Sequence, residues 1–126
     1  MVKLVLVLGD QLTPTLSALS EADKGTDIVV MAEVADEAAY VPHHPKKIAF
    51  IFAAMRKFAA KLEGDGWQVA YTKLDDPDNT GSITGELIRR AEEHGAQEVL
   101  ATEPGEWRLI EALNECPLKI TQLQDT

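Results

Sequence analysis

The chain has 126 residues, 45% of them hydrophobic, which is enough to bury the core of one domain over residues 1–126. Its 21 acidic and 12 basic residues give a formal net charge of −9, which argues against nucleic-acid binding by this chain alone, because phosphate contacts need a basic stripe. The single cysteine, Cys116, excludes an intramolecular disulfide, and neither a signal-peptide pattern nor a membrane-spanning run is found, so a cytoplasmic location is expected.

The first predicted element is a strand over Val2–Leu8, in which an uninterrupted apolar run begins at Leu4 and stops at Gly9-Asp10-Gln11-Leu12. Such a run is typical of a strand buried on both faces of a parallel sheet. The next segment, Leu12–Leu19, is predicted to be a short helix, with Thr13 as its N-cap and Pro14 in its first turn. A strand followed directly by a short helix indicates an α/β fold.

A β-branched run, Asp27–Glu33, predicts the second strand, and the main helix follows it. Apolar residues recur every three or four positions from Ile48 to Leu62, which marks one buried helical face. Pro45 suits the first turn of this helix, and glycines at 64 and 66 supply its end.

The remaining elements alternate in the same way. Further strands are predicted over Trp67–Leu74, Glu98–Glu103 and Leu118–Leu123, and further helices over Ile83–His94 and Pro104–Leu113. Five strands joined by helical crossovers predict a doubly wound, Rossmann-like α/β domain with a parallel sheet in the order 3-2-1-4-5 and helices on both faces.

In that strand order the winding reverses between the first and fourth strands, and a ligand crevice is expected there. Its predicted walls include Gly9, Asp10 and Gln11 after the first strand, Glu33 at the end of the second and Glu103 after the fourth. No glycine-rich phosphate loop is present, and the three acids would repel an anion. An uncharged, hydroxyl-rich ligand is therefore favoured, with capping of local amides by Asp10 as the alternative.

Signatures of catalysis and metal binding are weak. There is no Gly-x-Ser-x-Gly motif and no Cys-His arrangement. The adjacent His43 and His44 point in different directions and make a poor metal pair. Neither a catalytic residue nor a metal ligand is predicted. The basic residues near the main helix are interpreted as a solvated face: Lys46, Lys47, Arg56, Lys57 and Lys61.

Four separated blocks occur in order along the chain, LVLGDQL, EVADEAAYVPHHPKKIAFIFAAMRKFA, DDPDNTGS and TEPGEWR. Together they resemble the deoxyribodipyrimidine photolyase-related proteins, the bacterial iron-sulfur branch of the cryptochrome and photolyase superfamily, which includes the prokaryotic 6-4 photolyases. The resemblance runs from Leu4 to Thr126. It implies a doubly wound amino-terminal domain that holds an antenna chromophore, 6,7-dimethyl-8-ribityllumazine.

The resemblance also implies a helical region, not contained in this sequence, that carries FAD, a 4Fe-4S cluster on four cysteines and most of the DNA surface. These 126 residues are therefore expected to lack repair activity by themselves and to meet DNA only through that region. Self-association through the surface that the helical region would cover is also expected.

The resemblance places the antenna at the GDQL block and beside the segment from EAAY to KKIAFI. Leu12, Ile48 and Ile51 are predicted to form the apolar wall, while carboxylates and an amide accept hydrogen bonds from ribityl hydroxyls. The residues implicated by the resemblance are Gly9, Asp10, Gln11, Leu12, Glu37, Tyr40, Ile48 and Ile51, and the predicted topology adds Glu33, Lys47 and Glu103.

Two other interpretations stay open. A stand-alone regulatory or scaffold domain would bind a protein partner and would expose an apolar patch. A small enzyme acting on a ribityl or nucleoside-like substrate would use Asp10 or Glu103 as a base and would raise the pKa of that carboxyl group.

Overall fold

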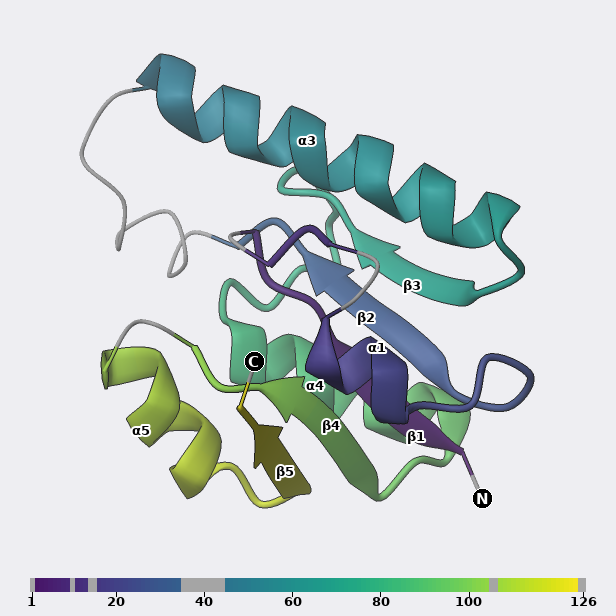
Figure 1. Cartoon of the computed structure of the whole chain (residues 1–126). Coiled ribbons are helices and arrows are strands. Elements are labelled where there is room, and N and C mark those ends of the chain that lie inside the picture. The colour runs from purple at the N-terminus through teal and green to yellow at the C-terminus, as the bar shows by residue number, and fades with distance from the viewer. Residues whose placement is uncertain (1, 10, 14–15, 35–44, 105–106, 125–126) are drawn as a thin grey trace.

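Five parallel strands form one sheet in the computed structural model of the chain, in the order β3-β2-β1-β4-β5 (Figure 1). The structure describes residues 2–9, 11–13, 16–34, 45–104 and 107–124, and for 45–48 and 107–108 it describes the backbone alone. The predicted parallel sheet and its order are confirmed. The strands are β1 (Lys3–Leu6), β2 (Ile28–Ala32), β3 (Gln68–Thr72), β4 (Glu98–Thr102) and β5 (Lys119–Leu123).

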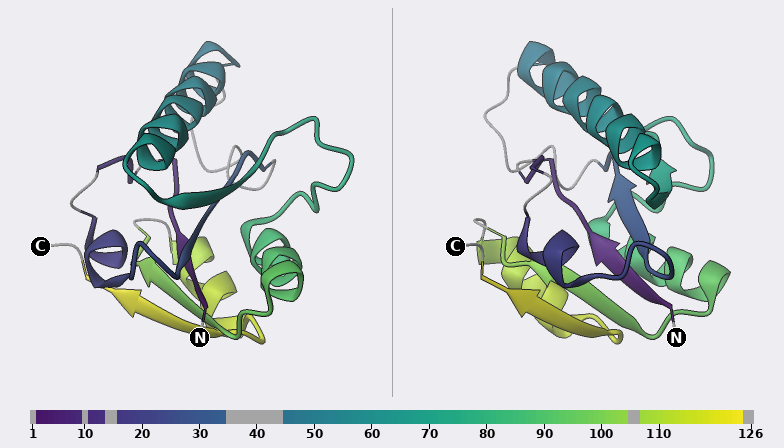
Figure 2. Two further views of the ribbon diagram at one scale, coloured as in Figure 1. Left: turned by 90° about the vertical axis from the view of Figure 1, so that its right-hand side faces the viewer. Right: turned by 45° about the vertical axis from the view of Figure 1, so that its right-hand side comes forward.

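Helices cover both faces of the sheet, as predicted. Figure 2 shows α1 and α3 on one side and α4 and α5 on the other, and each pair packs on its own core cluster. In the described part of the chain, no helix is both long and apolar enough to cross a membrane. The helices are α1 (Ser17–Glu21), α3 (Pro45–Gly64), α4 (Ile83–His94) and α5 (Trp107–Glu115).

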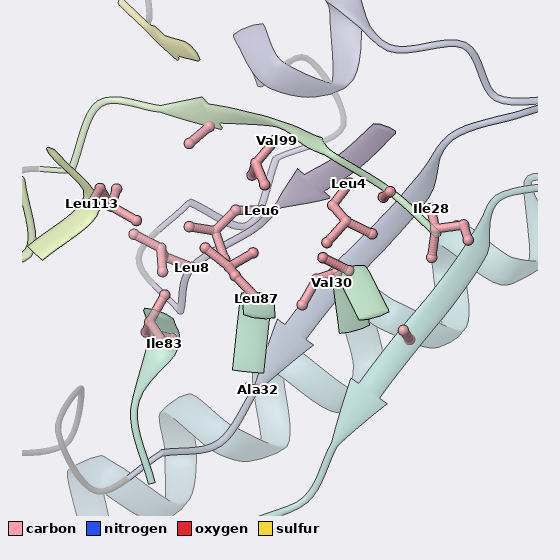
Figure 3. Close-up of a cluster of buried hydrophobic side chains, with 14 of the residues drawn as sticks. Leu4, Leu6, Leu8, Ile28, Val30, Ala32, Ile83, Leu87, Val99 and Leu113 are labelled. Carbon is pink, nitrogen blue, oxygen red and sulfur yellow. The ribbon is translucent and has the colours of Figure 1, made fainter. Parts of the chain in front are cut away.

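The apolar run of β1 supplies both cores, because successive side chains of a strand point to opposite faces. Leu4, Leu6 and Leu8 lie in the cluster under α4 and α5 (Figure 3), whereas Val5 and Val7 lie in the cluster under α1 and α3. All five side chains are at most 2% exposed. The run is uninterrupted because neither face of the central strand meets water.

The first helix begins later than the predicted range Leu12–Leu19. It starts at Ser17, and Leu16 at its N-cap makes no side-chain capping bond, so the prediction of Thr13 as N-cap is wrong. Ala18 N–H donates to Thr102 Oγ1 at 3.1 Å, and the Ser17 hydroxyl lies 2.9 Å from the same atom. The helix therefore starts where its first residues contact β4, and not at the Thr-Pro pair.

The main helix and its end agree with the sequence pattern. Phe52, Met55 and Leu62 are buried along one face, at 9%, 0% and 1% exposure. The helix ends at Gly64, and Gly66 has φ of +101°, a left-handed conformation that glycine adopts without steric cost. The chain then turns directly into β3, which α3 partly covers.

Candidate functional site

The side chain of Gln11 joins the carboxyl ends of β1 and β4 at the predicted switch point. Its Oε1 accepts from the Leu8 N–H at 3.4 Å, and its Nε2 donates to the Thr102 carbonyl at 3.0 Å. An amide has two donor and two acceptor positions, and these two described contacts use one of each. Gln11 is thus first of all a bridge across the switch point, and its contact with a ligand stays a prediction.

Leu12 and Ile51, predicted to line one apolar wall, are both partly buried against the core cluster under α1 and α3. Gly9 is half-buried, whereas Glu103 is exposed and its N–H donates to the Leu123 carbonyl at 2.7 Å. The other predicted contacts are not described: Asp10, Glu37 and Tyr40 lie outside the described residues, and only the backbone of Lys47 and Ile48 is described.

Glu33 follows β2 and is fully buried, with an exposed fraction of 0%. Arg56 on α3 donates through Nε to Oε2 at 2.6 Å and through Nη2 to Oε1 at 2.8 Å. The Tyr71 hydroxyl donates to Oε2 at 2.5 Å, and the Leu74 N–H donates to Oε1 at 3.1 Å. Burial alone would raise the pKa of Glu33, but these hydrogen bonds outweigh it and hold the pKa below its usual value.

This arrangement changes two sequence-based interpretations. Each carboxylate oxygen of Glu33 already accepts two hydrogen bonds, so the carboxylate has no evident capacity left for the hydroxyls of a ligand. Arg56, interpreted as part of a solvated basic face, is about half exposed, at 51%, and is the bidentate partner of Glu33. The pair serves to fix the guanidinium beside α3 rather than to offer a free acid.

Beside this pair lies a hollow of about 720 Å³ on the flank of α3. Its walls combine apolar side chains of α3 with Leu74 and Asp75, which follow β3, and both Glu33 and Arg56 reach it. Small-molecule sites are typically ~300–1,000 Å³ with mostly apolar walls and a few fixed polar groups. Among the described contacts Arg56 Nη1 makes no hydrogen bond, so it is the fixed donor that remains for a ligand. The α3 residues in the wall are Ala49, Phe52, Ala53 and Arg56.

A second buried acid, Glu86 on α4, lies on the opposite face of β3 and is 0% exposed. Its Oε1 accepts from Thr72 Oγ1 at 2.6 Å and from Arg89 Nη2 at 2.7 Å. Its Oε2 accepts from the N–H and the hydroxyl of Thr80, at 3.0 and 2.8 Å. Burial opposes ionisation, but bonds from Arg89, Thr72 and Thr80 prevail and lower the pKa of Glu86 to about 2.

The two acids anchor the loop that contains the DDPDNTGS block. Glu33 holds the Leu74 N–H at one end of the loop, and Glu86 holds Thr80 at the other. Between them, Asn79 Nδ2 donates to the carbonyls of Glu33 and Lys73, at 2.9 and 3.0 Å. In the sequence, this block contributed only to the family resemblance, and no structural role was predicted for it. The available signal was Glu86 itself, an acid at an otherwise apolar position between Ile83 and Leu87.

The strand order defines a doubly wound α/β domain, a class that binds ligands at the carboxyl edge of its sheet. The hollow borders that edge beside β2 and β3, and its described lining includes no residue from the expected switch point between β1 and β4. The family model of the deoxyribodipyrimidine photo-lyase-related proteins matches residues 5–126, and the chain belongs to this family. It is similar to a protein named (6-4) photolyase from Agrobacterium fabrum (strain C58 / ATCC 33970), with 54% identity over 109 residues. The match covers 86% of this chain and 22% of that relative, so the chain spans about a fifth of the relative's length. The predicted resemblance is confirmed.

Proposed function

We propose that this chain is the antenna-chromophore domain of a photolyase-like DNA-repair flavoprotein and that it binds 6,7-dimethyl-8-ribityllumazine. When bound, this group absorbs light and passes the excitation on, so the domain needs to supply neither a nucleophile nor a proton. The single observation that supports a ligand here is the hollow of about 720 Å³ beside the Glu33–Arg56 pair. Family membership supports the choice of ligand.

The residues present fit such a chromophore. Ala49, Phe52 and Ala53 offer apolar surface for a planar ring, and Arg56 Nη1 offers a donor to a ring carbonyl. Because Glu33 neutralises the Arg56 charge, the hollow suits an uncharged ring better than an anion. Further contacts are proposed from the sequence for Gly9, Asp10, Gln11, Leu12, Glu37, Tyr40, Lys47, Ile48, Ile51 and Glu103.

The repair reaction and DNA binding of the proposed flavoprotein are assigned to residues outside these 126. The chain holds one cysteine, Cys116, so a cluster on four cysteines would need thiolates from elsewhere, and FAD and most of the DNA contact are likewise assigned to a separate helical region. We propose that the isolated chain has no repair activity and that the protein works in the cytoplasm.

Fluorescence titration of the purified chain with the ribityllumazine tests the proposal. Saturable binding at micromolar concentration is expected for the wild type. Ala53→Trp would fill the hollow and should abolish binding, while Ala60→Trp, an exposed position on the same helix, should bind normally. Absence of binding at roughly 100 μM, a concentration well above that expected for a specific site, would contradict the antenna assignment.

The same titration locates the ring. If Ala53→Trp binds normally and Ile51→Ala or Leu12→Ala weakens binding, the ring lies on the other flank of α3, against the wall that the sequence predicted. That result would keep the antenna function and overturn the hollow as its site.

A second candidate, self-association, rests on one observation. The exposed large hydrophobic side chains among the described residues are Phe50 and Leu74, at 74% and 51% exposure. A large aromatic side chain with most of its surface exposed is a candidate for burial against another protein. Sedimentation at increasing concentration should show a dimer that Phe50→Ser removes and that Lys57→Ser, an exposed change on the same helix, leaves intact. A monomer at all concentrations would contradict this candidate.

A further inference from the structure

Besides the Glu33–Arg56 pair, one more charged residue lines the hollow beside α3. It is Asp75, which follows β3 and is exposed. In the described part of the chain, its carboxylate makes neither a hydrogen bond nor an ion pair. The hollow therefore offers an acceptor that the protein itself does not use, in addition to the donor Arg56 Nη1.

The backbone on both sides of Asp75 is held by hydrogen bonds. The Leu74 N–H donates to Glu33 Oε1 at 3.1 Å, and the Asp76 N–H donates to the Lys73 carbonyl at 3.0 Å. Glu33 is fully buried, and the same carboxylate holds the guanidinium on α3. One buried acid thus fixes both the donor of α3 and the chain segment that carries the acceptor, before any ligand arrives.

The charges of the described lining favour an uncharged ligand. Glu33 balances Arg56, so the carboxylate of Asp75 leaves this lining negative and would repel an anion. A cation would meet the guanidinium of Arg56 in the same wall. A neutral ligand that offers an acceptor to Arg56 and a donor to Asp75 satisfies both groups without an added charge.

We propose that the hollow beside α3 selects a planar, uncharged ring that carries an N–H next to a carbonyl, as a cyclic imide does. The ring N–H donates to the Asp75 carboxylate, and the carbonyl accepts from Arg56 Nη1. The face of the ring packs on the apolar wall that Phe52 and its neighbours on α3 supply. A ring without the N–H displaces water from the carboxylate and returns no hydrogen bond, so it binds less tightly.

This inference rests on the proposed chromophore site and names the chemical feature by which that site recognises its ligand. The ring of a lumazine contains such an imide, with its N–H between two carbonyls. The ribityl chain lies on another part of the ring system, so the imide can be tested without it. Asp75 is thereby assigned the role of a specificity-determining residue of the hollow.

Fluorescence titration of the full 126-residue chain with two methyl isomers of lumazine tests the proposal. One isomer carries its methyl group on the imide nitrogen, and the other carries it on the second nitrogen of the same ring and keeps the imide N–H. The isomers have the same size and nearly the same apolar surface, so they differ chiefly in this donor. The isomer without the imide N–H should bind about tenfold more weakly, the effect of one hydrogen bond to a charged group.

Variants of the loop and of α3 separate recognition from structure. Asp75→Ala removes the acceptor and should make the two isomers bind alike, which a purely structural role of Asp75 would not do. Asp78→Ala removes an equal charge from an exposed position of the same loop and should keep the tenfold preference. Arg56→Lys keeps the charge beside Glu33 but loses the planar fork, and it should weaken both isomers to a similar degree.

A parallel titration with 6,7-dimethyl-8-ribityllumazine distinguishes this inference from the antenna assignment. If the ribityllumazine binds and the two isomers bind equally, the antenna function stands and the imide selection is overturned. If the isomers differ as expected and the ribityllumazine does not bind, the imide selection stands and the antenna assignment fails. The imide selection is also overturned by equal responses of Asp75→Ala and Asp78→Ala, or if the isomer that keeps the N–H does not bind below roughly 1 mM.

Discussion

Arg56 holds the buried carboxylate of Glu33 with two nitrogens, at 2.6 and 2.8 Å, and so ties α3 to the end of β2. The contact joins a half-exposed cation to a carboxylate with no solvent access. Such a carboxylate needs hydrogen-bonded partners to stay ionised in the folded protein. The contact also sets one wall of the hollow beside α3. The same two side chains therefore determine both the stability of the carboxyl end of β2 and the shape of the proposed chromophore site.

Loss of the Arg56 guanidinium should destabilise the fold. Arg56→Gln leaves the Glu33 carboxylate buried with only two of its four donors, and we expect a loss of about 2 kcal/mol, below the ~3–5 kcal/mol for fully buried pairs because Arg56 is half exposed. Urea unfolding measures it. Lys57→Gln, the exposed neighbour, is the control and should change stability by less than ~0.5 kcal/mol. Equal effects of the two variants would contradict a special role for Arg56.

Tyr71 should ionise late and should be needed for full stability. Burial and the Glu33 carboxylate both raise the pKa of this phenol. Because the neutral phenol is the form that the folded state favours, its contribution is present below the ordinary pKa near 10 and is lost as pH rises further. Tyr71→Phe should cost roughly 1–2 kcal/mol and remove the late step from an absorbance titration. A wild-type titration that shows no tyrosine ionising above the ordinary pKa near 10 would contradict the assignment.

Much of the fold was predictable because it depends on local periodicity. The apolar run of β1 and the stripe of α3 repeat at the spacing of a doubly buried strand and a one-sided helix, and the crossover lengths then restrict the topology. The start of α1 was not predictable in this way. It is associated with Thr102, more than eighty residues further along the chain, and no local signal reports such a contact.

For the site, strand order predicts only which residues follow strands at the carboxyl edge of the sheet. There Gln11 donates to the Thr102 carbonyl at the end of β4, whereas Glu33 holds the loop after β3, and the contact of either residue with a ligand stays a prediction. Glu33 could face either a ligand or a cation of the protein itself, and the outcome depends on Arg56. The helical spacing of Arg56 predicts only that this residue lies on the exposed face of α3. Periodicity specifies a face and does not specify which partner a long side chain reaches.

Acid should weaken the fold through its two buried carboxylates. The pKa of Glu33 is lowered and that of Glu86 is lowered to about 2, so both contributions are complete above the unfolded value of 4.5 and are lost at lower pH, that of Glu86 as pH falls toward about 2. For Glu86 this amounts to about 3 kcal/mol, at 1.36 kcal/mol per pKa unit. Unfolding free energies measured from pH 7 to 3 should decline in the wild type and decline less steeply in Glu86→Gln. Glu92→Gln, exposed on the same helix, should keep the wild-type slope.

Gly85 should resist replacement by alanine, although alanine normally favours a helix by about 1 kcal/mol over glycine. A Cβ at this position would lie 2.5 Å from Thr80 Oγ1 and 2.8 Å from Ser82 Oγ. Neither hydroxyl is free to move away, since Thr80 donates to Glu86 and Ser82 caps α4 by accepting from the Gly85 N–H at 3.0 Å.

Gly85→Ala should therefore lower the unfolding free energy by roughly 1–3 kcal/mol, through strain and loss of the cap. Gly64→Ala is the matched control, because no heavy atom lies within 4 Å of its added Cβ and the residue ends α3. We expect that change to be neutral or slightly stabilising. Hydrogen exchange should also show faster exchange at the Thr80 N–H in Gly85→Ala alone. A stabilised Gly85→Ala variant would mean that the loop before α4 can shift without cost, and it would contradict the view of Glu86 as a rigid anchor of that loop.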